Sequence, residues 1–411
     1  MTLINIETYS TCFLLIVLLS VCNMGDTVEV PCIQRTYNEC EVDPSVCPNL
    51  NDVNTANEDN IIIPSYESVK DTISIDILCP TNLTHVPRFI LRKFPKLRQI
   101  RMMNTGITSL NVGSFLSGHS LTQLDLRSNQ ISTVPANVFA NLNRLEHINL
   151  AYNKIARVEP GAFDQVPALR TVILSNNLLQ TIESRSFNGA GNLTELYFES
   201  NEIQTIETGA LNLPKLEIIS LKDNRLTSLP KDVFGNAERL EKVDLSNNAL
   251  VEIGDLFNDK TSLYSLSLSN NPDVKDADLF KLTHQIPNLS YLYLANTGLK
   301  LTNEPKEPTK QTDTEDESNY SLTYLDLSSN NLNSPDIFLH LTQFKSLKTI
   351  SLNNNDMTHL NHIALLKGLF SRLDSIEFKY NSNVDLNWLR RAVPILKKQN
   401  IRLIMEQQLS E

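Results

Sequence analysis

One pattern of apolar and polar positions, L-x-x-L-x-L-x-x-N-x-L, recurs along the chain from residue 97 onward. Its central residues alternate between apolar and other side chains, which predicts a short strand with one buried and one exposed face. The first leucines of the first five copies are 24 residues apart. A constant period of this length predicts a solenoid, in which each copy stacks on the next and the strands form a parallel sheet.

The pattern occurs twelve times, with substitutions in some copies. The copies span 97–107, 121–131, 145–155, 169–179, 193–203, 216–226, 240–250, 263–273, 289–299, 322–332, 347–357 and 373–383. We expect the asparagine at the ninth position to turn inward, because its amide can satisfy buried backbone groups that would otherwise cost about 1–3 kcal/mol each. Six further apolar residues lie 18 positions after a first leucine and predict a second core column: Phe115, Phe139, Phe163, Phe187, Leu211 and Phe234.

From about residue 75 to the C-terminus the chain resembles the leucine-rich repeat family, and the 24-residue period with a phenylalanine column is similar to its extracellular class. The resemblance implies an α/β solenoid. Its fold would be a curved leucine-rich repeat horseshoe, with a parallel β-sheet on the concave face and an irregular or helical convex side. Ligands would then bind the exposed strand positions of the concave face.

Within the family, the chain looks like Toll-type receptor ectodomains and secreted insect leucine-rich proteins. Its low glycine content, many asparagines and cysteine-free C-terminal end are similar to the mosquito leucine-rich immune proteins. The chain ends without heptads, so the resemblance is to the short type that lacks a coiled coil.

The first 96 residues predict a signal peptide and a cap. The apolar segment 13–19 is too short to span a bilayer and fits the core of a secretory signal, although no Lys or Arg precedes it. We therefore expect a cleaved signal peptide at 1–22 and a disulfide-bonded N-terminal cap at 23–96, with a first strand within 71–80. Four cysteines remain after cleavage, Cys32, Cys40, Cys47 and Cys79, and their spacing does not fit zinc. They predict two disulfides with three possible pairings.

The solenoid is predicted to span 97–383, with an interruption at 302–321. That segment has two prolines, six acidic residues and no aliphatic residue, which predicts an acidic loop. Thr297 replaces the ladder asparagine just before it, so we expect the coil to depart from the standard path there. The loop is either a tolerated insertion or a flap beside a ligand site.

Residues 384–411 predict a C-terminal cap made of a helix and a final strand. We expect Pro394 to break or bend the helix. The helix either seals the last repeat or offers Trp388 as a dimer contact, so the protein is predicted to be a monomer or a weak dimer. One helical face gathers the apolar residues Trp388, Leu389, Ala392, Val393 and Leu396.

The charge limits the possible partners, and the glycosylation motifs agree with secretion. The net charge of −11 and pI of about 5.2 argue against nonspecific binding to nucleic acid or anionic lipid. Beyond the signal, no apolar run reaches transmembrane length. We therefore expect a secreted glycoprotein. Four N-x-S/T motifs predict glycan acceptors at Asn82, Asn192, Asn288 and Asn319.

No catalytic or metal-binding constellation is visible in the sequence. His359 and His362 lie three residues apart without a metal signature. The acidic residues Glu195 and Glu199 share one strand face, and we interpret them as a solvated surface rather than an acid–base pair. We predict that the protein is not an enzyme and needs no cofactor or metal.

The third and fifth positions of the repeats predict three zones on the concave face. A basic patch of Arg98, Arg101 and Arg127, with Asp125 among them, lies near the start. A middle zone combines Glu195, Tyr197 and Glu199 with flanking Ile173 and Ile218. Four tyrosines gather toward the end: Tyr264, Tyr291, Tyr293 and Tyr324. Exposed tyrosines favour protein interfaces, although they also simply stack across strands.

The predicted function is recognition of another protein, or of a microbial or matrix ligand, through the concave face. The residues predicted to bind are Tyr197, Tyr264, Tyr291, Tyr293, Tyr324, Glu195, Glu199, Arg101 and Arg127. The resemblance implies a role in innate immunity or receptor signalling. The alternative is a structural role in extracellular matrix or cell adhesion.

Overall fold

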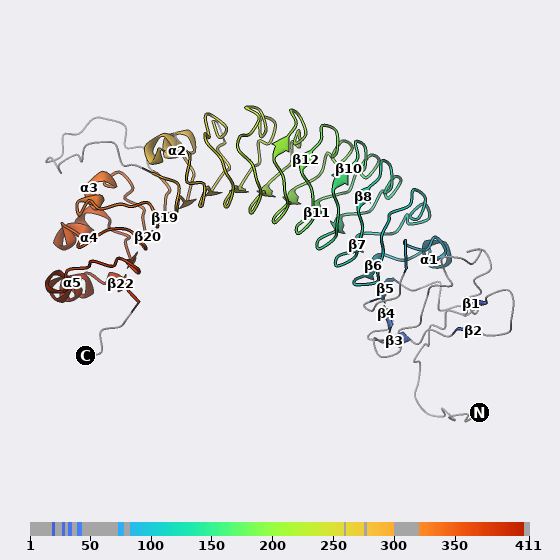
Figure 1. The fold of residues 1–411 in the computed structure, drawn as a ribbon, viewed down its shortest axis with the longest axis horizontal. Coiled ribbons are helices and arrows are strands. Elements are labelled where there is room, and N and C mark those ends of the chain that lie inside the picture. The colour runs from blue at the N-terminus through green and yellow to red at the C-terminus, as the bar shows by residue number, and fades with distance from the viewer. Residues whose placement is uncertain are drawn as a thin grey trace, which may run out of the picture. The chain divides into compact units, whose positions relative to one another are not determined.

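The computed structural model describes residues 19–20, 27–28, 32–34, 39–42, 73–77, 83–258, 260–274, 278–299 and 320–406. These residues fall into two units. Unit 1 comprises 1–202 with 209–213, and unit 2 comprises 203–208 with 214–411. Within each unit, successive coils stack so that their strands lie side by side along one edge (Figure 1). The predicted α/β solenoid with a parallel sheet is confirmed, and each unit is described by itself below.

Unit 1 begins with short strands and continues with one strand per coil. A separate pair, β1 (Leu19–Ser20) and β2 (Thr27–Val28), is antiparallel. Helix α1 spans Phe89–Lys93, and small strands β8 (Thr133–Val134), β10 (Arg157–Val158) and β12 (Thr181–Ile182) lie outside the main sheet. The main sheet runs in the order β3 (Cys32–Gln34), β4 (Glu39–Val42), β5 (Ser74–Ile77), β6 (Gln99–Met102), β7 (Gln123–Asp125), β9 (His147–Asn149), β11 (Thr171–Ile173) and β13 (Glu195–Tyr197).

Unit 2 continues the same repeat and adds helices on the side away from the strands (Figure 1). Its sheet contains β15 (Ile218–Ser220), β16 (Lys242–Asp244), β17 (Ser265–Ser267), β18 (Tyr291–Tyr293), β19 (Tyr324–Asp326), β20 (Thr349–Ser351), β21 (Ser375–Glu377) and β22 (Arg402–Ile404), in this order. The small strand β14 spans Thr205–Ile206. The helices are α2 (Leu279–Gln285), α3 (Ile337–His340), the 3-10 turn η5 (Ile363–Leu365), α4 (Leu366–Leu369) and α5 (Leu386–Lys398).

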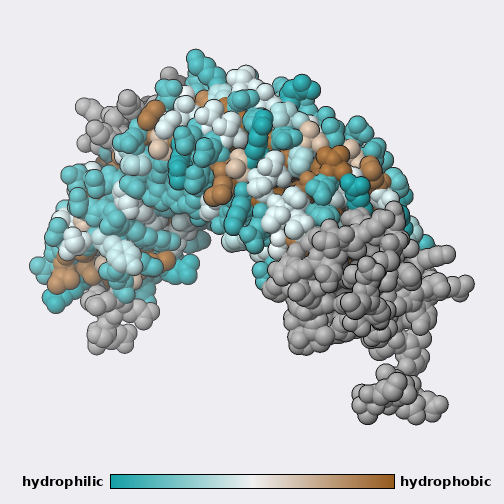
Figure 2. Space-filling model, turned by 45° about the vertical axis from the view of Figure 1, so that its right-hand side comes forward, coloured by the Kyte–Doolittle hydropathy of each residue, from teal (hydrophilic) through white to brown (hydrophobic). Residues whose placement is uncertain are grey.

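The core contains the residues that the repeat predicted. The repeat leucines are almost fully buried, and so are the six residues of the second column. In unit 1 the rings of that column stack, with centroids 5.7 Å apart for Phe139–Phe163 and 5.2 Å for Phe163–Phe187. Because these apolar residues are buried, the face visible in Figure 2 is mostly hydrophilic, and its hydrophobic areas are small and separate.

The ninth-position asparagines turn inward as expected. Asn153 is typical: its side-chain oxygen accepts from the Ile131 N–H at 3.0 Å, and its Nδ2 donates to the carbonyls of Leu126 and Leu150, each at 3.0 Å. The bond to Leu126 joins one coil to the coil before it. At Thr297, which replaces the asparagine, the hydroxyl donates to the carbonyl of Leu294 in its own coil at 2.9 Å and to Oδ1 of Asn330 in the next coil at 3.4 Å. Among the described residues, the shorter side chain therefore lacks the bond to the preceding coil that Asn153 makes.

The eighth position of every repeat is in the left-handed backbone region, from Asn104 with φ 57° to Tyr380 with φ 59°. Asn, Ser and Asp occupy this position in ten repeats because they tolerate that conformation. Tyr152 and Tyr380 are the two exceptions, and both side chains are exposed. This backbone requirement was not visible in the leucine spacing.

The C-terminal residues form the predicted helix and strand. Helix α5 continues through Pro394, so of the two expected effects of that proline, a break or a bend, the break is wrong. The Trp388 ring is 6% exposed and its Nε1 donates to the carbonyl of Leu360 at 2.9 Å. This burial fits a cap and leaves little of the ring for a dimer contact. Val393 is 41% exposed, so its predicted place on the buried face is also wrong.

Several predictions concern residues outside the described part. The signal peptide 1–22 is described only at Leu19–Ser20, and the loop 302–321 only at its end. Cys47, Cys79, Asn82 and Asn319 lie outside the described residues, and for Cys32 and Cys40 only the strand backbone is described. The disulfides, their pairing and these two glycan sites therefore remain predictions. No helix among the described residues has the length and apolar character to cross a bilayer.

Candidate ligand-binding face

Each strand of the repeats buries its middle residue and turns the residues on both sides toward the open face of the sheet. Because neighbouring strands pair in register, equivalent positions form columns, as with Tyr291 opposite Tyr324. The third and fifth positions therefore lie where the repeat predicted. Five small residues in these columns are nevertheless buried: Thr171, Ser220, Ser265, Ser351 and Ser375. Larger neighbours cover them, which no count of positions reveals.

The first predicted zone is a set of ion pairs rather than a free basic patch. Arg101 pairs with the carboxylate of Asp76, which lies directly opposite it on the neighbouring strand and is 5% exposed. Arg127 pairs with Asp125, with 3.2 Å between Nε and Oδ2. The contribution of Asp76 was missed, because the register of its strand β5 was not predicted. Its sequence signal is the alternation in SIDI (74–77), which aligns Asp76 with Arg101.

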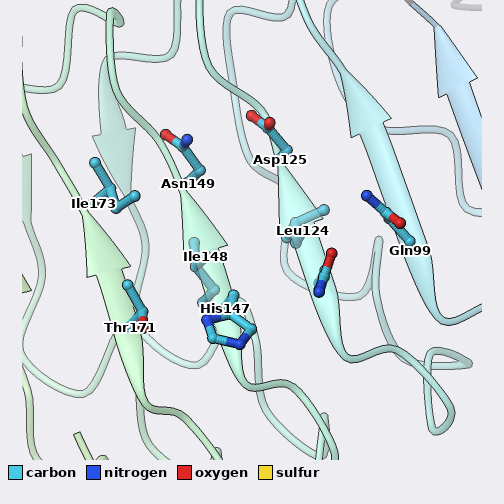
Figure 3. Close-up of a pocket in the computed structure, with 9 residues that line it drawn as sticks. Gln99, Leu124, Asp125, His147, Ile148, Asn149, Thr171 and Ile173 are labelled. Carbon is cyan, nitrogen blue, oxygen red and sulfur yellow. The ribbon is translucent and has the colours of Figure 1, made fainter. Parts of the chain in front are cut away.

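A pocket of about 280 Å³ lies on the sheet face of unit 1, next to these ion pairs. It crosses strands β6, β7, β9 and β11, and Figure 3 shows its side chains. None of its lining residues was among those predicted to bind. The lining consists of Gln99, Gln123, Leu124, Asp125, His147, Ile148, Asn149, Thr171 and Ile173.

The pocket is rich in polar groups. Burial raises the pKa of the Asp125 carboxyl, against the lowering effect of the hydrogen bond and charge of Arg127. Thr171 is 8% exposed, and its hydroxyl makes no hydrogen bond within the described part of the chain. The arrangement suits a ligand with hydrogen-bonding groups.

The second zone brings Tyr197, Glu195 and Glu199 together in unit 1, as predicted. The Tyr197 hydroxyl donates to the Glu195 carboxylate at 3.2 Å, and the Ser175 hydroxyl donates to Glu199. Burial, followed by the charge of Glu195, raises the pKa of Tyr197 to about 12. Both carboxylates are thus partly engaged by neighbouring hydroxyls, and only one aromatic ring is present in the zone.

The third zone, here called the tyrosine patch, consists of Tyr264, Tyr291, Tyr293 and Tyr324 in unit 2. The four rings form a continuous chain of contacts. Their centroids are 6.4 Å apart for Tyr264–Tyr291, 6.4 Å for Tyr291–Tyr324 and 5.1 Å for Tyr293–Tyr324. The tyrosines therefore do contact one another across neighbouring strands, as the alternative interpretation expected. These contacts leave part of the ring surface accessible, because Tyr291 is 42% and Tyr264 39% exposed.

Small residues border the tyrosine patch on both sides along the sheet. Strand β17 carries Ser265 and Ser267 before it, and β20 carries Thr349 and Ser351 after it. The large rings of the patch therefore have only short side chains between them and the next large residues along these strands. Aromatic surface of this kind provides much contact area at little cost in side-chain entropy.

The predicted glycan acceptors that are described occupy equivalent positions. Asn192 donates from Nδ2 to the carbonyl of Pro167 at 2.6 Å, and Asn288 does so to Thr261 at 2.7 Å. Each bond reaches the preceding coil, and the Asn288 side chain is exposed. A glycan on Nδ2 leaves one N–H on this atom, so such a bond is compatible with attachment.

Titratable clusters offer no support for a metal or catalytic centre. Within the described residues, no three His, Cys, Asp or Glu side chains gather as metal ligands would. His359 bonds its neighbour Thr358, and His362 pairs with Asp336 at 3.1 Å. The two histidines thus have separate partners.

Family models of leucine-rich repeats match much of the chain. The model described as "Leucine rich repeat" matches residues 95–155 and 119–179, and a second leucine-rich repeat model matches 321–341. The model of the "BspA type Leucine rich repeat region (6 copies)" matches residues 156–287. No curated protein matches the sequence.

Solved structures of similar fold include a leucine-rich repeat protein of Leptospira interrogans, with a TM-score of 0.60 and 22% identity over 82% of this chain and 86% of that one. TLR13, solved in complex with single-stranded RNA, has a TM-score of 0.56 at 18% identity, over 82% of this chain and 55% of its own. Drosophila Toll, solved in complex with Spatzle, has a TM-score of 0.55 at 22% identity, over 84% and 53%. This chain spans about half of the last two. Identities this low establish similarity of fold alone.

Proposed function

This chain belongs to the leucine-rich repeat family, and we propose that it is a secreted recognition protein that binds a protein partner through the tyrosine patch on its sheet face. The observation that carries the proposal is the chain of four rings in unit 2, joined by three ring contacts, with two rings still about two-fifths exposed. Leucine-rich repeat proteins are typically non-enzymatic binding modules. Tyrosine is enriched at the energetic centres of protein interfaces.

The proposed setting is innate immunity or receptor signalling. It is supported by the fold similarity to Toll, whose structure is a complex with Spatzle, and to TLR13. Infection-induced transcription of this gene would support this role. Steady expression in one developing tissue, with retention of the protein in matrix, would instead support the structural alternative.

Secretion is part of the proposal and has its own test. The apolar segment 13–19 and the four N-x-S/T motifs support it. We expect the full chain, expressed in insect cells, to enter the medium as a glycoprotein whose mass falls after glycosidase treatment. Removal of residues 1–22 should keep it inside the cell. Equal secretion of both forms would contradict the predicted signal.

The binding site is tested with a protein captured from extracellular fluid of the source organism. Its affinity is measured for the wild type and for Tyr291→Ala plus Tyr293→Ala. The matched control removes two exposed tyrosines elsewhere, as Tyr152→Asn plus Tyr380→Asn, and installs the residue that most repeats carry at that backbone position. We expect loss of binding with the first variant only. Unchanged affinity in both would contradict the proposed site.

A further inference from the structure

Three carboxylates of unit 2, Asp244, Asp326 and Glu377, lie in the same row across the sheet as Tyr293. Asp326 on β19 lies directly opposite Tyr293 on β18. Burial raises the pKa of the Tyr293 hydroxyl, and nearby groups, Asp326 and Asp244 among them, raise it further. Burial likewise raises the pKa of Tyr324, with added effects of Asp326 and Glu377. The rings therefore lie in the negative field of all three carboxylates.

These carboxylates have only neutral hydrogen-bond partners. Asp244 accepts from the Ser246 N–H at 2.9 Å and from the Ser246 hydroxyl at 2.6 Å. Asp326 accepts in the same way from Ser328, with 3.0 Å to its N–H. The third carboxylate, Glu377, accepts from Nδ2 of Asn353 at 2.8 Å. Within the described part of the chain, none of the three forms an ion pair.

Hydrogen bonds of this kind fix the carboxylates without neutralising them. Serine and asparagine donors hold each group in place, and no cation among the described residues pairs with these carboxylates, which share a row of the sheet with the half-buried ring of Tyr293. Covering such charges with an apolar or anionic surface removes them from water without compensation, which opposes binding. A cation placed there gains from both the carboxylate and the ring face.

We propose that the tyrosine patch binds arginine side chains presented by a protein partner. This inference rests on the proposed function and names the chemistry of its ligand. A guanidinium stacks on an aromatic ring and donates to a carboxylate at the same time, which a compact ammonium group does less well. Asp326 and the rings of Tyr293 and Tyr324 provide both interactions within one short stretch of sheet.

The test uses a fluorescent peptide with five arginines spaced by glycine and serine, and a matched peptide with citrulline at the same positions. Citrulline keeps the planar shape and most of the hydrogen-bonding groups but carries no charge. Affinities are measured by fluorescence anisotropy at low and at moderate salt. The protein variants are Tyr291→Ala plus Tyr293→Ala, and Asp326→Asn.

A control separates local recognition from general attraction to an acidic protein, because the net charge is −11. Asp232→Asn makes the same change in charge at an exposed position in the turn before Phe234. We expect wild type to bind the arginine peptide about tenfold tighter than the citrulline peptide. Both patch variants should lose at least about fivefold in affinity for the arginine peptide, and Asp232→Asn should lose less than about twofold.

Equal affinity for the two peptides would overturn the inference, and so would equal losses in Asp326→Asn and Asp232→Asn. Failure of the inference differs from failure of the proposed function. If the captured partner needs Tyr291 and Tyr293 while the peptides bind alike, the patch is a binding site without a preference for cations. If the arginine peptide binds the patch but the captured partner ignores both tyrosines, the proposed function is wrong.

Discussion

Two regions of the sheet face carry charged side chains, and they differ in how the charges are balanced. In unit 1, Arg101 and Arg127 are paired with Asp76 and Asp125 inside the chain. In unit 2, the carboxylates beside the tyrosine patch, Asp326 among them, accept only from neutral donors. Charges that are balanced internally offer little to a partner. Unbalanced charges beside exposed rings contribute little to the fold and remain available for binding.

The two regions should share one scaffold, which is the basis for comparing their surfaces. Asn153 in unit 1 and Asn248 in unit 2 make equivalent bonds, each with three partners at 3.0 Å. We expect Asn153→Ala and Asn248→Ala each to lower the free energy of unfolding by about 3 kcal/mol, because buried backbone groups lose their partners. Urea unfolding measures both. A loss in only one unit would show that the scaffolds differ.

Removing the charge of Arg101 should destabilise unit 1, whereas removing the charge of Asp326 should leave the stability of unit 2 nearly unchanged. Arg101→Ala leaves the Asp76 carboxylate buried without its cation, so we expect a loss of about 2 kcal/mol, reduced from the buried-pair range because Arg101 is partly exposed. Asp326→Asn keeps an acceptor for Ser328 and should change stability by less than about 0.5 kcal/mol.

The exposed Arg98, on the same side of unit 1, is the control for Arg101. Arg98→Ala should also change the unfolding free energy by less than about 0.5 kcal/mol. Equal effects of Arg98→Ala and Arg101→Ala would mean that the Asp76 pair contributes nothing. A large loss in Asp326→Asn would remove the contrast between the regions.

The pH dependence of stability probes the charge next to the pocket of unit 1. Burial raises the pKa of Asp125, so the folded protein holds this proton more tightly than the unfolded chain does. The stability from this group is complete below the ordinary carboxyl pKa and is lost as pH rises through the raised value. The wild type should therefore lose stability relative to Asp125→Asn as pH rises from about 3 to about 6. An opposite slope in urea midpoints would mean that Arg127 dominates.

The smallest effect is spectroscopic and concerns Tyr197. Because its pKa is raised to about 12, its ionisation should follow that of exposed tyrosines. The difference in tyrosinate absorbance between wild type and Tyr197→Phe should develop above about pH 11. A difference centred on the ordinary tyrosine value, about 10, would show that the ring is more open to water than the contacts with Glu195 imply.

The sequence predicted the scaffold because every repeat places the same residue types at the same positions. A leucine spacing of 24 places the core, the strands and the inward asparagines without knowledge of any contact. It also identified the tyrosine patch, since Leu292 and Leu294 fix the direction of Tyr291 and Tyr293.

Features that depend on partners in other strands were not predictable in the same way. The Arg101–Asp76 pair required the register of β5, and Thr171 is buried by neighbours that position counts ignore. The C-terminal helix was predicted, but its continuation through Pro394 was not, although Trp388 and Leu396 on either side of the proline are both buried.

The most direct test measures the affinity of the protein partner for variants of the tyrosine patch and of the Glu195–Tyr197 zone. The protein partner is titrated against Tyr291→Ala plus Tyr293→Ala in unit 2, and against Glu195→Ala plus Tyr197→Ala in unit 1. We predict that the unit 2 variant loses at least about 30-fold in affinity, the equivalent of about 2 kcal/mol of binding free energy. The unit 1 variant should lose less than about twofold in affinity. A large loss confined to the unit 1 variant would contradict the account.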